Sequence, residues 1–149
     1  MTDTGPTTPL PLLAKMIVPL HTFIYRVSGG RLGKTMGGAP VLLLMVRGRK
    51  SGKLYRLPLI YVTTDKGYAV IATQGGAPKH PAWFLNLQAA GAAVIQIGSD
   101  KIPVKAHVLP DPTDPRHQMI WQAGVDIFPG YNEYKARTSR LIPIVELLP

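Results

Sequence analysis

VLLLMVRGRKSGKLYRLPLIYV, residues 41–62, is the stretch from which the architecture of this chain can be read. Two apolar runs, 41–46 and 54–62, flank a short glycine-bracketed basic segment, and this pattern predicts a strand, a tight loop and a second strand. The first run is apolar without alternation, which predicts a strand buried on both faces. Pro58 interrupts the second run and predicts a sheet edge or a bulge.

The loop Gly48-Arg49-Lys50-Ser51-Gly52 carries the groups that an anion site needs. Its two glycines let the backbone turn and bring N–H groups close to a ligand. Arg49 and Lys50 add positive charge, and Ser51 adds a hydroxyl, which together suit a phosphate. From these five residues alone, a solvated hairpin loop that happens to be charged is an equally good interpretation.

Composition favours one domain with an anionic partner. The 149 residues hold 17 Lys and Arg against 8 Asp and Glu, a formal charge of +9, which favours nucleic acid, an acidic membrane surface or an anionic small molecule. The absence of cysteine excludes disulfides and thiol nucleophiles. Residues 1–9 are rich in Thr and Pro, lack the features of a signal peptide and are expected to form a disordered tail before a single domain over 10–149.

An amphipathic helix with a basic edge is predicted over 10–27, kinked at Pro19. It either packs on the core or lies on an acidic membrane surface. Residues 28–40 form a glycine-rich basic loop that does not match a nucleotide-binding fingerprint.

The remaining chain predicts a mainly β protein of the α+β class. Helices are expected from Pro81 to about Ala90 and from Asp114-Pro115 to near Gly124, with a loop over 128–134. Six strands with many Gly and Pro turns predict a barrel of mostly antiparallel strands with short flanking helices. The six strands are 41–46, 54–62, 68–73, 94–97, 102–108 and 142–147.

No catalytic constellation is visible in the sequence. The four histidines lack H-x-x-x-H spacing, there is no G-x-S-x-G, and the few carboxylates are scattered, so no metal site, triad or carboxylate pair is expected. A binding site remains. The glycine-rich loop 74–80 and the helix N-terminus at Pro81 offer N–H groups, and Trp83, Tyr131 and Tyr134 offer aromatic walls for a flat ligand with an anionic tail.

Three motifs in register carry a family resemblance. They are Gly48–Gly52 followed by Pro58, then Gly75-Gly76-Ala77-Pro78-Lys79-His80-Pro81-Ala82-Trp83-Phe84-Leu85-Asn86-Leu87, and then Pro129-Gly130-Tyr131 with Tyr134, Arg137-Thr138 and Ile142-Pro143-Ile144. From about residue 20 to its end, the chain closely resembles the deazaflavin-dependent nitroreductase and quinone reductase family of actinobacteria, mycobacteria among them.

The resemblance implies a split β-barrel of the flavin-reductase type that binds coenzyme F420 and passes hydride from its reduced form to a quinone, a nitroaromatic or an activated enone. Tyr131 and Tyr134 would line the substrate side, and either one or solvent would deliver a proton. It also implies a cytoplasmic enzyme, with contact to the inner face of the plasma membrane through 10–27. The implied cofactor-binding residues are Arg49, Lys50, Ser51, Gly52, Arg56, Pro58, Thr73, Gln74, Gly75, Gly76, Ala77, Pro78, Lys79, Trp83 and Asn86.

One departure and two alternatives stand beside this interpretation. Where many members carry Ser-Lys before the Gly-Gly pair, this chain has Thr73-Gln74, so a contact near the cofactor is expected to differ. An FMN-binding split-barrel reductase is the second enzyme hypothesis. A non-enzymatic basic module on an acidic membrane or on nucleic acid is the third. Nucleic acid is not expected, because no basic helix with interleaved aromatics is present.

Overall fold

The structure is a computed structural model that describes residues 35–36 and 38–149. The predicted tail 1–9, the helix 10–27 and most of the loop 28–40 lie outside the described residues. The elements are β1 (Thr35–Met36), β2 (Ala39–Arg47), β3 (Leu54–Ile60), β4 (Val62–Thr64), β5 (Gly67–Ile71), the 3-10 turn η1 (Gln74–Gly76), α2 (Ala82–Ala90), β6 (Ala92–Ile97), β7 (Asp100–Leu109), α3 (Pro115–Ile127), α4 (Gly130–Ala136) and β8 (Ile144–Leu148).

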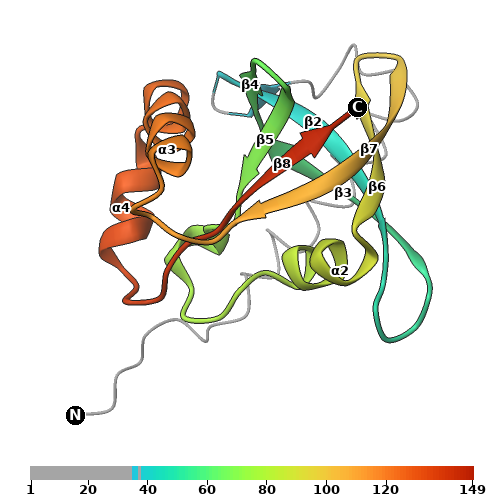
Figure 1. Ribbon diagram of the computed structural model, residues 1–149, viewed down its shortest axis with the longest axis horizontal. Coiled ribbons are helices and arrows are strands. Elements are labelled where there is room, and N and C mark those ends of the chain that lie inside the picture. Colours follow the sequence, from blue (N-terminus) through green and yellow to red (C-terminus); the bar gives the residue numbers. More distant parts are fainter. Residues whose placement is uncertain (1–34, 37) are drawn as a thin grey trace.

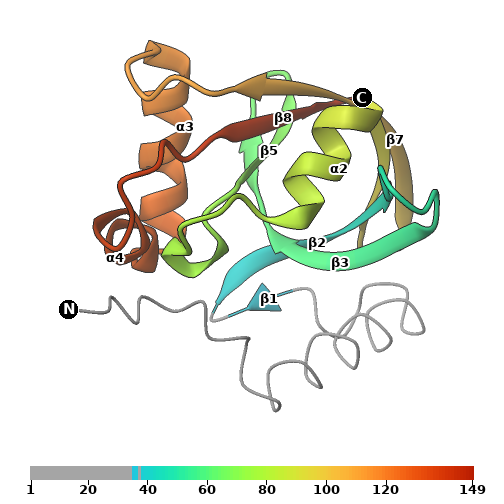
Figure 2. The same cartoon turned by 90° about the horizontal axis from the view of Figure 1, so that it is seen from below.

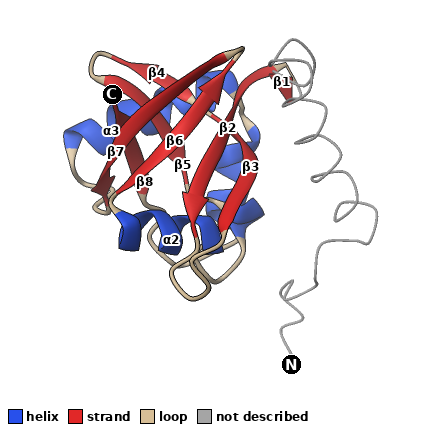
Figure 3. Cartoon of the chain, turned by 90° about the vertical axis from the view of Figure 1, so that its right-hand side faces the viewer, coloured by secondary structure: helices blue, strands red, loops and turns tan. Residues whose placement is uncertain are grey.

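The strands form a single antiparallel sheet that curls on itself (Figures 1 and 3). Its order is β1-β2-β6-β7-β8-β5-β4, and β3, which is not part of this order, also pairs with β2. Tyr61 alone joins β3 to β4, yet these strands pair with β2 and β5, at opposite ends of the order. The chain therefore closes the sheet into a split barrel, which confirms the predicted fold class.

Tyr61 marks a correction to the predicted strand 54–62. The run divides here into two strands because it must leave β2 and reach β5. The Tyr61 N–H donates to the Pro40 carbonyl (3.2 Å), and its ring contacts Tyr68 edge-on. Pro58 lies in β3, opposite Leu43 of β2. Among the described strands β3 pairs only with β2, so the predicted edge position of Pro58 is confirmed.

The predicted double burial of the first apolar run is confirmed. Residues 41–46 of β2 are all buried on both faces of the strand, and Leu42, Leu44 and Val46 belong to the cluster inside the barrel. The barrel interior forms one hydrophobic cluster, to which Phe84 and Leu87 of α2 contribute. A second cluster lies where α3 and α4 pack beside the sheet, whereas α2 covers one end of the barrel (Figure 2).

Two helix boundaries differ from the sequence prediction. α3 continues past Gly124 to Ile127. A Cβ at Gly124 would sit 2.5 Å from Ile71 Cδ1, so the packing of α3 against β5 requires a glycine at this position. This glycine allows close packing and does not end the helix. Most of the predicted loop 128–134 is α4, which starts at Gly130 directly after Pro129. The last strand begins at Ile144, two residues later than predicted.

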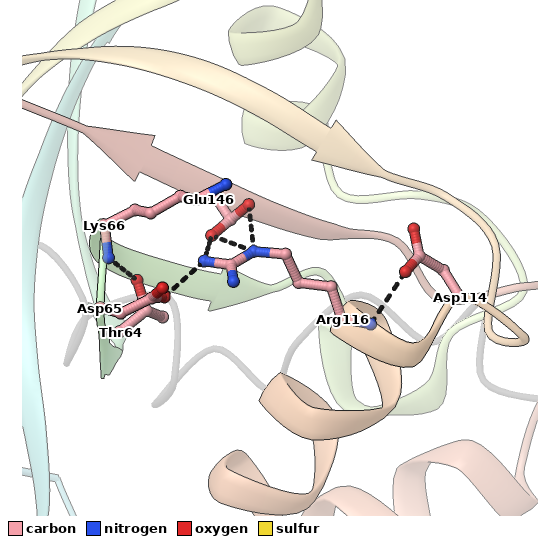
Figure 4. Close-up of polar contacts among 6 residues, drawn as sticks. All are labelled: Thr64, Asp65, Lys66, Asp114, Arg116 and Glu146. Atoms are coloured by element: carbon pink, nitrogen blue, oxygen red, sulfur yellow. Dashed lines mark hydrogen bonds and ion pairs between the residues drawn. The ribbon is translucent and has the colours of Figure 1, made fainter.

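A buried ion pair fastens α3 to the sheet (Figure 4). Glu146 of β8 has 1% exposure, and both its oxygens accept from Arg116 Nε at 2.9 Å. The same guanidinium donates to Asp65 at 2.8 Å, and the Arg116 backbone N–H donates to Asp114, the N-cap of α3. The network joins α3 to β8 and to the turn between β4 and β5. It also gives the buried Glu146 carboxylate the partner that a buried charge requires. No described helix is long and apolar enough to cross a membrane.

Candidate cofactor site

A cavity of about 580 Å³ opens where the β2–β3 hairpin meets the start of α2. The hairpin loop and α2 lie at the same end of the barrel (Figure 3). Segments far apart in the sequence build it: the hairpin loop with the start of β3, Gln74 of the loop before α2, and the N-terminal half of α2 with its N-cap. Its lining residues are Gly48, Arg49, Lys50, Ser51, Tyr55, Arg56, Leu57, Gln74, Pro81, Ala82, Trp83 and Asn86.

The hairpin loop has a conformation that requires its glycines. The Gly48 N–H donates to Lys53 O (2.7 Å), and the Gly52 N–H donates to Gly48 O (2.9 Å). Gly52 has a φ of +72°, a value that favours glycine. A Cβ at Gly48 would lie 2.5 Å from the Tyr55 ring, so the glycine allows that ring to lie against the loop beside the cavity.

Asn86 holds the hairpin loop against α2. Its Oδ1 accepts hydrogen bonds from both the Arg49 backbone N–H (3.1 Å) and Arg49 Nη1 (2.7 Å). The side chain is buried, whereas Arg49 and Lys50 are exposed. Asn86 thus orients one cation of the loop before any ligand arrives.

The N-terminus of α2 meets the same cavity. Pro81 is its N-cap, so the helix begins at Ala82, one position later than predicted, and no side chain caps the first turn. The N–H groups of Phe84 and Leu85 turn back to Pro81 O, which leaves the two preceding amides at the helix end without such a bond. Pro81 and Ala82 line the cavity, so the positive end of the helix dipole lies beside it.

The cavity lining carries three cations and no carboxylate: Arg49, Lys50 and Arg56. Trp83 and Tyr55 provide flat apolar surface beside them. The described residues also contain no group of three or more side chains that could ligate a metal ion. The site therefore suits an anionic ligand with a flat ring.

The loop before α2 has an unusual backbone. Gln74, Gly75 and Gly76 have successive φ values of +45°, +63° and +82°. A Cβ at Gly76 would lie 2.5 Å from the carbonyl oxygen of Tyr134, so this glycine allows α4 to pack directly against the loop. Only Gln74 of this loop lines the cavity.

Arg140 anchors this loop and was not among the predicted site residues. Its guanidinium donates to the carbonyls of Ala72 (3.0 Å), Thr73 (2.8 Å) and Ala77 (2.9 Å) and contacts His80 Nδ1 at 3.1 Å. No short sequence motif predicts this role, because three of the acceptors are backbone oxygens more than 60 positions away in the chain.

Tyr131 and Tyr134 lie in the second hydrophobic cluster, and neither lines the cavity. Tyr131 is buried with its ring against Trp121 and Phe128, and burial, with Tyr134 nearby, raises the pKa of its hydroxyl above the usual value. Tyr134 is half-buried, and the Arg137 guanidinium lies 5.5 Å from its ring centre. A role for either in the reaction stays a prediction.

The structure brings together seven of the predicted cofactor residues: Arg49, Lys50, Ser51, Arg56, Gln74, Trp83 and Asn86. The others lie outside this lining, and their contacts with the cofactor stay predictions: Gly52, Pro58, Thr73, Gly75, Gly76, Ala77, Pro78 and Lys79. The prediction missed Tyr55, although an exposed aromatic next to a basic loop is a usable signal.

Comparisons with known proteins agree with this chemistry. The sequence profile of the F420H2-dependent quinone reductase family matches residues 18–149. An F420H2-dependent quinone reductase of Mycobacterium tuberculosis is 35% identical over 133 residues, which cover 88% of this chain and 89% of that protein.

Two solved structures share the fold. One, described as a domain-swapped dimer, has a TM-score of 0.65 and 30% identity and covers 91% of this chain and 98% of its own. The other, the F420-H2 dependent reductase FDR-A, has a TM-score of 0.63 and 34% identity and covers 72% of this chain and 93% of its own.

The fold, the uncapped helix end and the carboxylate-free basic cavity fit a cofactor that combines a phosphate with a flat ring. Family membership does not favour the FMN-binding and non-enzymatic alternatives. With the profile match over nearly the whole chain, we conclude that the protein belongs to the F420H2-dependent quinone reductase family: it is an oxidoreductase whose cofactor is coenzyme F420 and whose hydride acceptor is of the quinone type.

Proposed function

We propose that the cavity at the end of the barrel is the F420 site, and that the hairpin loop 48–52 and the N-terminus of α2 hold the cofactor phosphate. One observation carries the proposal. A basic loop and an uncapped helix N-terminus converge on one cavity whose lining contains no carboxylate. A phosphate gains from both sources of positive potential.

Reduced F420, when bound, supplies the hydride, so the protein needs to bind, orient and exclude water. Arg49 is already fixed by Asn86, which lowers the entropy lost when it meets an anion. Lys50 and Arg56 are exposed cations on the same lining and would contact the more distant negative groups of the cofactor. Trp83 and Tyr55 would flank the apolar part.

Tyr134 is the better of the two predicted proton donors. Tyr131 is buried, and its raised pKa makes loss of its proton harder. Tyr134 is half-buried, and its backbone packs on Gly76 of the loop beside the cavity. Solvent stays the alternative source of the proton. Nitroaromatics and activated enones are proposed as further acceptors beside quinones.

A cofactor titration tests the proposal. F420 is expected to bind much more tightly than FMN, and Lys50→Ala is expected to weaken F420 binding about tenfold, the loss of one charge-assisted contact. Lys101→Ala removes the same charge from the exposed β6–β7 hairpin and is expected to leave the affinity unchanged. A natural protein that does not bind F420 would refute the proposal.

We also propose that the protein is cytoplasmic and contacts the inner face of the plasma membrane through residues 10–27. This proposal rests on the sequence alone, since that segment lies outside the described residues. The positive charges of Lys15 and Arg26 within this segment support the contact. Co-sedimentation with acidic phospholipid vesicles should fall when both are changed to Glu. Equal sedimentation of the two proteins would argue that the segment packs on the protein.

A further inference from the structure

Arg140 holds the chain segment that leads into α2 and the proposed cofactor cavity. It lies between α4 and β8, and its guanidinium uses Nε, Nη1 and Nη2 on four acceptors of segment 72–80. These acceptors are spread along the segment: Ala72 and Thr73 at its start, Ala77 in its middle and His80 near its end. A planar guanidinium can hold several acceptors in one fixed arrangement, which a point charge cannot do.

Segment 72–80 needs such an anchor. Three successive positive φ values leave it without a regular hydrogen-bonding pattern, and its single turn is closed by two bonds, Gly76 N–H to Thr73 O (2.9 Å) and Ala77 N–H to Gln74 O (3.1 Å). Backbone conformations of this kind persist only when the surroundings over-determine them. Arg140 supplies that constraint from one side, and the close contact of Gly76 with α4 supplies it from another.

The anchor also shapes the electrostatics of the site. Arg140 takes carbonyl oxygens, the negative ends of the peptide groups, and does not itself line the cavity. Among the described residues, no carboxylate lies within ion-pair distance of it; the ion pairs found there belong to Arg116. The cation therefore adds to the positive potential around the segment that leads into α2.

The same segment sets the position of two cavity residues. Gln74 lies at its start, and Pro81, which caps α2, follows His80 directly. The His80 ring also contacts the Phe84 ring of α2, with 5.0 Å between centres. A displaced segment 72–80 would move both Gln74 and the helix end that faces the cofactor.

We propose that Arg140 is a positioning residue for F420 binding: its guanidinium holds segment 72–80 in the conformation that presents Gln74 and the α2 N-terminus to the cofactor. The proposal rests on the proposed function for the identity of the ligand. It assigns Arg140 no contact with F420 and no part in the transfer of hydride.

The first test compares F420 affinity in folded variants. Arg140→Ala is expected to weaken F420 binding at least about tenfold. Arg140→Lys should bind F420 almost as weakly, because one ammonium group cannot replace the several fixed N–H donors of the guanidinium. Arg137→Ala is the matched control. It removes the same charge three positions away, where the contact to Gly75 O is long, at 3.5 Å, and it should change the affinity by less than about threefold.

Chemical rescue separates positioning from general stability. Arg140 also borders a second cavity of about 440 Å³ between α3 and residues 138–142, which gives a small molecule access to the space left by Arg140→Ala. Methylguanidinium is expected to restore F420 affinity in this variant and to leave Arg137→Ala unchanged. Arg116→Met, which disturbs the Glu146 ion pair instead, should lower thermal stability without changing the affinity.

Amide hydrogen exchange provides a readout that does not need F420. In Arg140→Ala, the Gly76 and Ala77 amides should exchange faster, whereas the strand amides of β2 should not. If the natural protein does not bind F420, the proposed function fails, and faster exchange at these amides still supports the anchor. A folded Arg140→Ala protein with natural F420 affinity overturns the inference, whatever its exchange rates.

Discussion

Asn86 shows how a buried amide sets the conformation of an exposed loop. Its Oδ1 accepts two hydrogen bonds from Arg49, which lies 37 positions earlier in the chain. The bonds tie the hairpin loop to α2, so the two sources of positive potential at the cavity keep a fixed relation. The family resemblance implies that Asn86 lines the cofactor pocket, and the structure shows that it holds Arg49 there.

Replacing Asn86 by Leu should therefore weaken F420 binding by about 1.5–3 kcal/mol, the range for a hydrogen bond to a charged group, or roughly ten- to a hundredfold. Leu is similar in size, so the helix should persist. Gln88→Leu, at an exposed position of the same helix, is the control. Fluorescence titration with F420 measures the effect, and an unchanged affinity in Asn86→Leu would exclude a role for the amide in loop position.

Two neighbouring glycines allow a matched test of packing at the cofactor loop. Both Gly75 and Gly76 have positive φ, but only Gly76 faces the backbone of α4, where a Cβ would lie 2.5 Å from Tyr134 O. A backbone atom cannot move aside as a side-chain end can. Gly76→Ala should cost about 1–3 kcal/mol of unfolding free energy beyond the cost of Gly75→Ala, which meets open space.

Urea unfolding of both glycine variants measures this difference. Equal losses would mean that backbone strain alone decides the cost and that the close approach of α4 contributes nothing.

At the scale of elements, α2 has two opposite requirements. An uncapped N-terminus is less stable than a capped one, but it leaves N–H groups for a ligand. The helix accepts a local loss of stability where the cofactor phosphate is proposed to bind. Such a conflict between local preference and structure is typical of a functional site.

Ala82→Glu should separate these requirements. A carboxylate in the first turn of α2 interacts favourably with the dipole and should stabilise the protein by about 0.3–1 kcal/mol. It also places negative charge in the cavity lining, so F420 affinity should fall at least about tenfold. Ala90→Glu, at the exposed last residue of the helix, should do neither. Thermal unfolding and F420 titration are measured on the same samples, and a variant that binds F420 normally would contradict the proposed phosphate position.

The sequence predicted elements where the local signal is strong and failed where pairing decides. The apolar run 41–46 and the alternating run 102–108 lie within β2 and β7. The division at Tyr61 depends on which strands pair with each half, which no local pattern contains. α4 was missed because Pro129-Gly130 signals a turn, and its seven residues owe their helix to aromatic packing against α3.

The cofactor site divides in the same way. Loop 48–52 could be predicted because charge, hydroxyl and glycine lie next to one another in the sequence. Arg140 could not, because its four partners are set by tertiary structure and three of them are backbone oxygens. The departure at Thr73-Gln74 predicted a changed contact near the cofactor; Gln74 lines the cavity, whereas Thr73 is buried and does not.

At the scale of the whole molecule, the ion-pair network around Arg116 makes the free energy of unfolding depend on pH. The hydrogen bond from Arg116 holds the pKa of Asp65 below its usual value near 3.8. A lowered native pKa means that the unfolded chain binds protons first as pH falls. The contribution of Asp65 is therefore fully present above about pH 4 and is lost as pH drops through its native pKa.

Asp65→Asn should accordingly be less stable than the natural protein at pH 7, and the two stabilities should converge as the pH falls below about 4. Urea unfolding at a series of pH values measures this. Asp100→Asn removes a carboxylate from the exposed β6–β7 hairpin and serves as the control. Parallel curves for the natural protein and Asp65→Asn would show that the contact with Arg116 has no effect on stability.

The position of β8 within the sheet has a consequence for synthesis on the ribosome. β8 pairs with both β5 and β7, although it is made after every other described strand. Until residues 144–148 leave the exit tunnel, β5 and β7 each present an open edge, the kind of surface that nascent chains aggregate through and chaperones cover. Arg140 emerges only shortly before β8, so until both have left the ribosome the growing polypeptide has neither a closed barrel nor an anchored cofactor loop, and F420 has no complete site to enter.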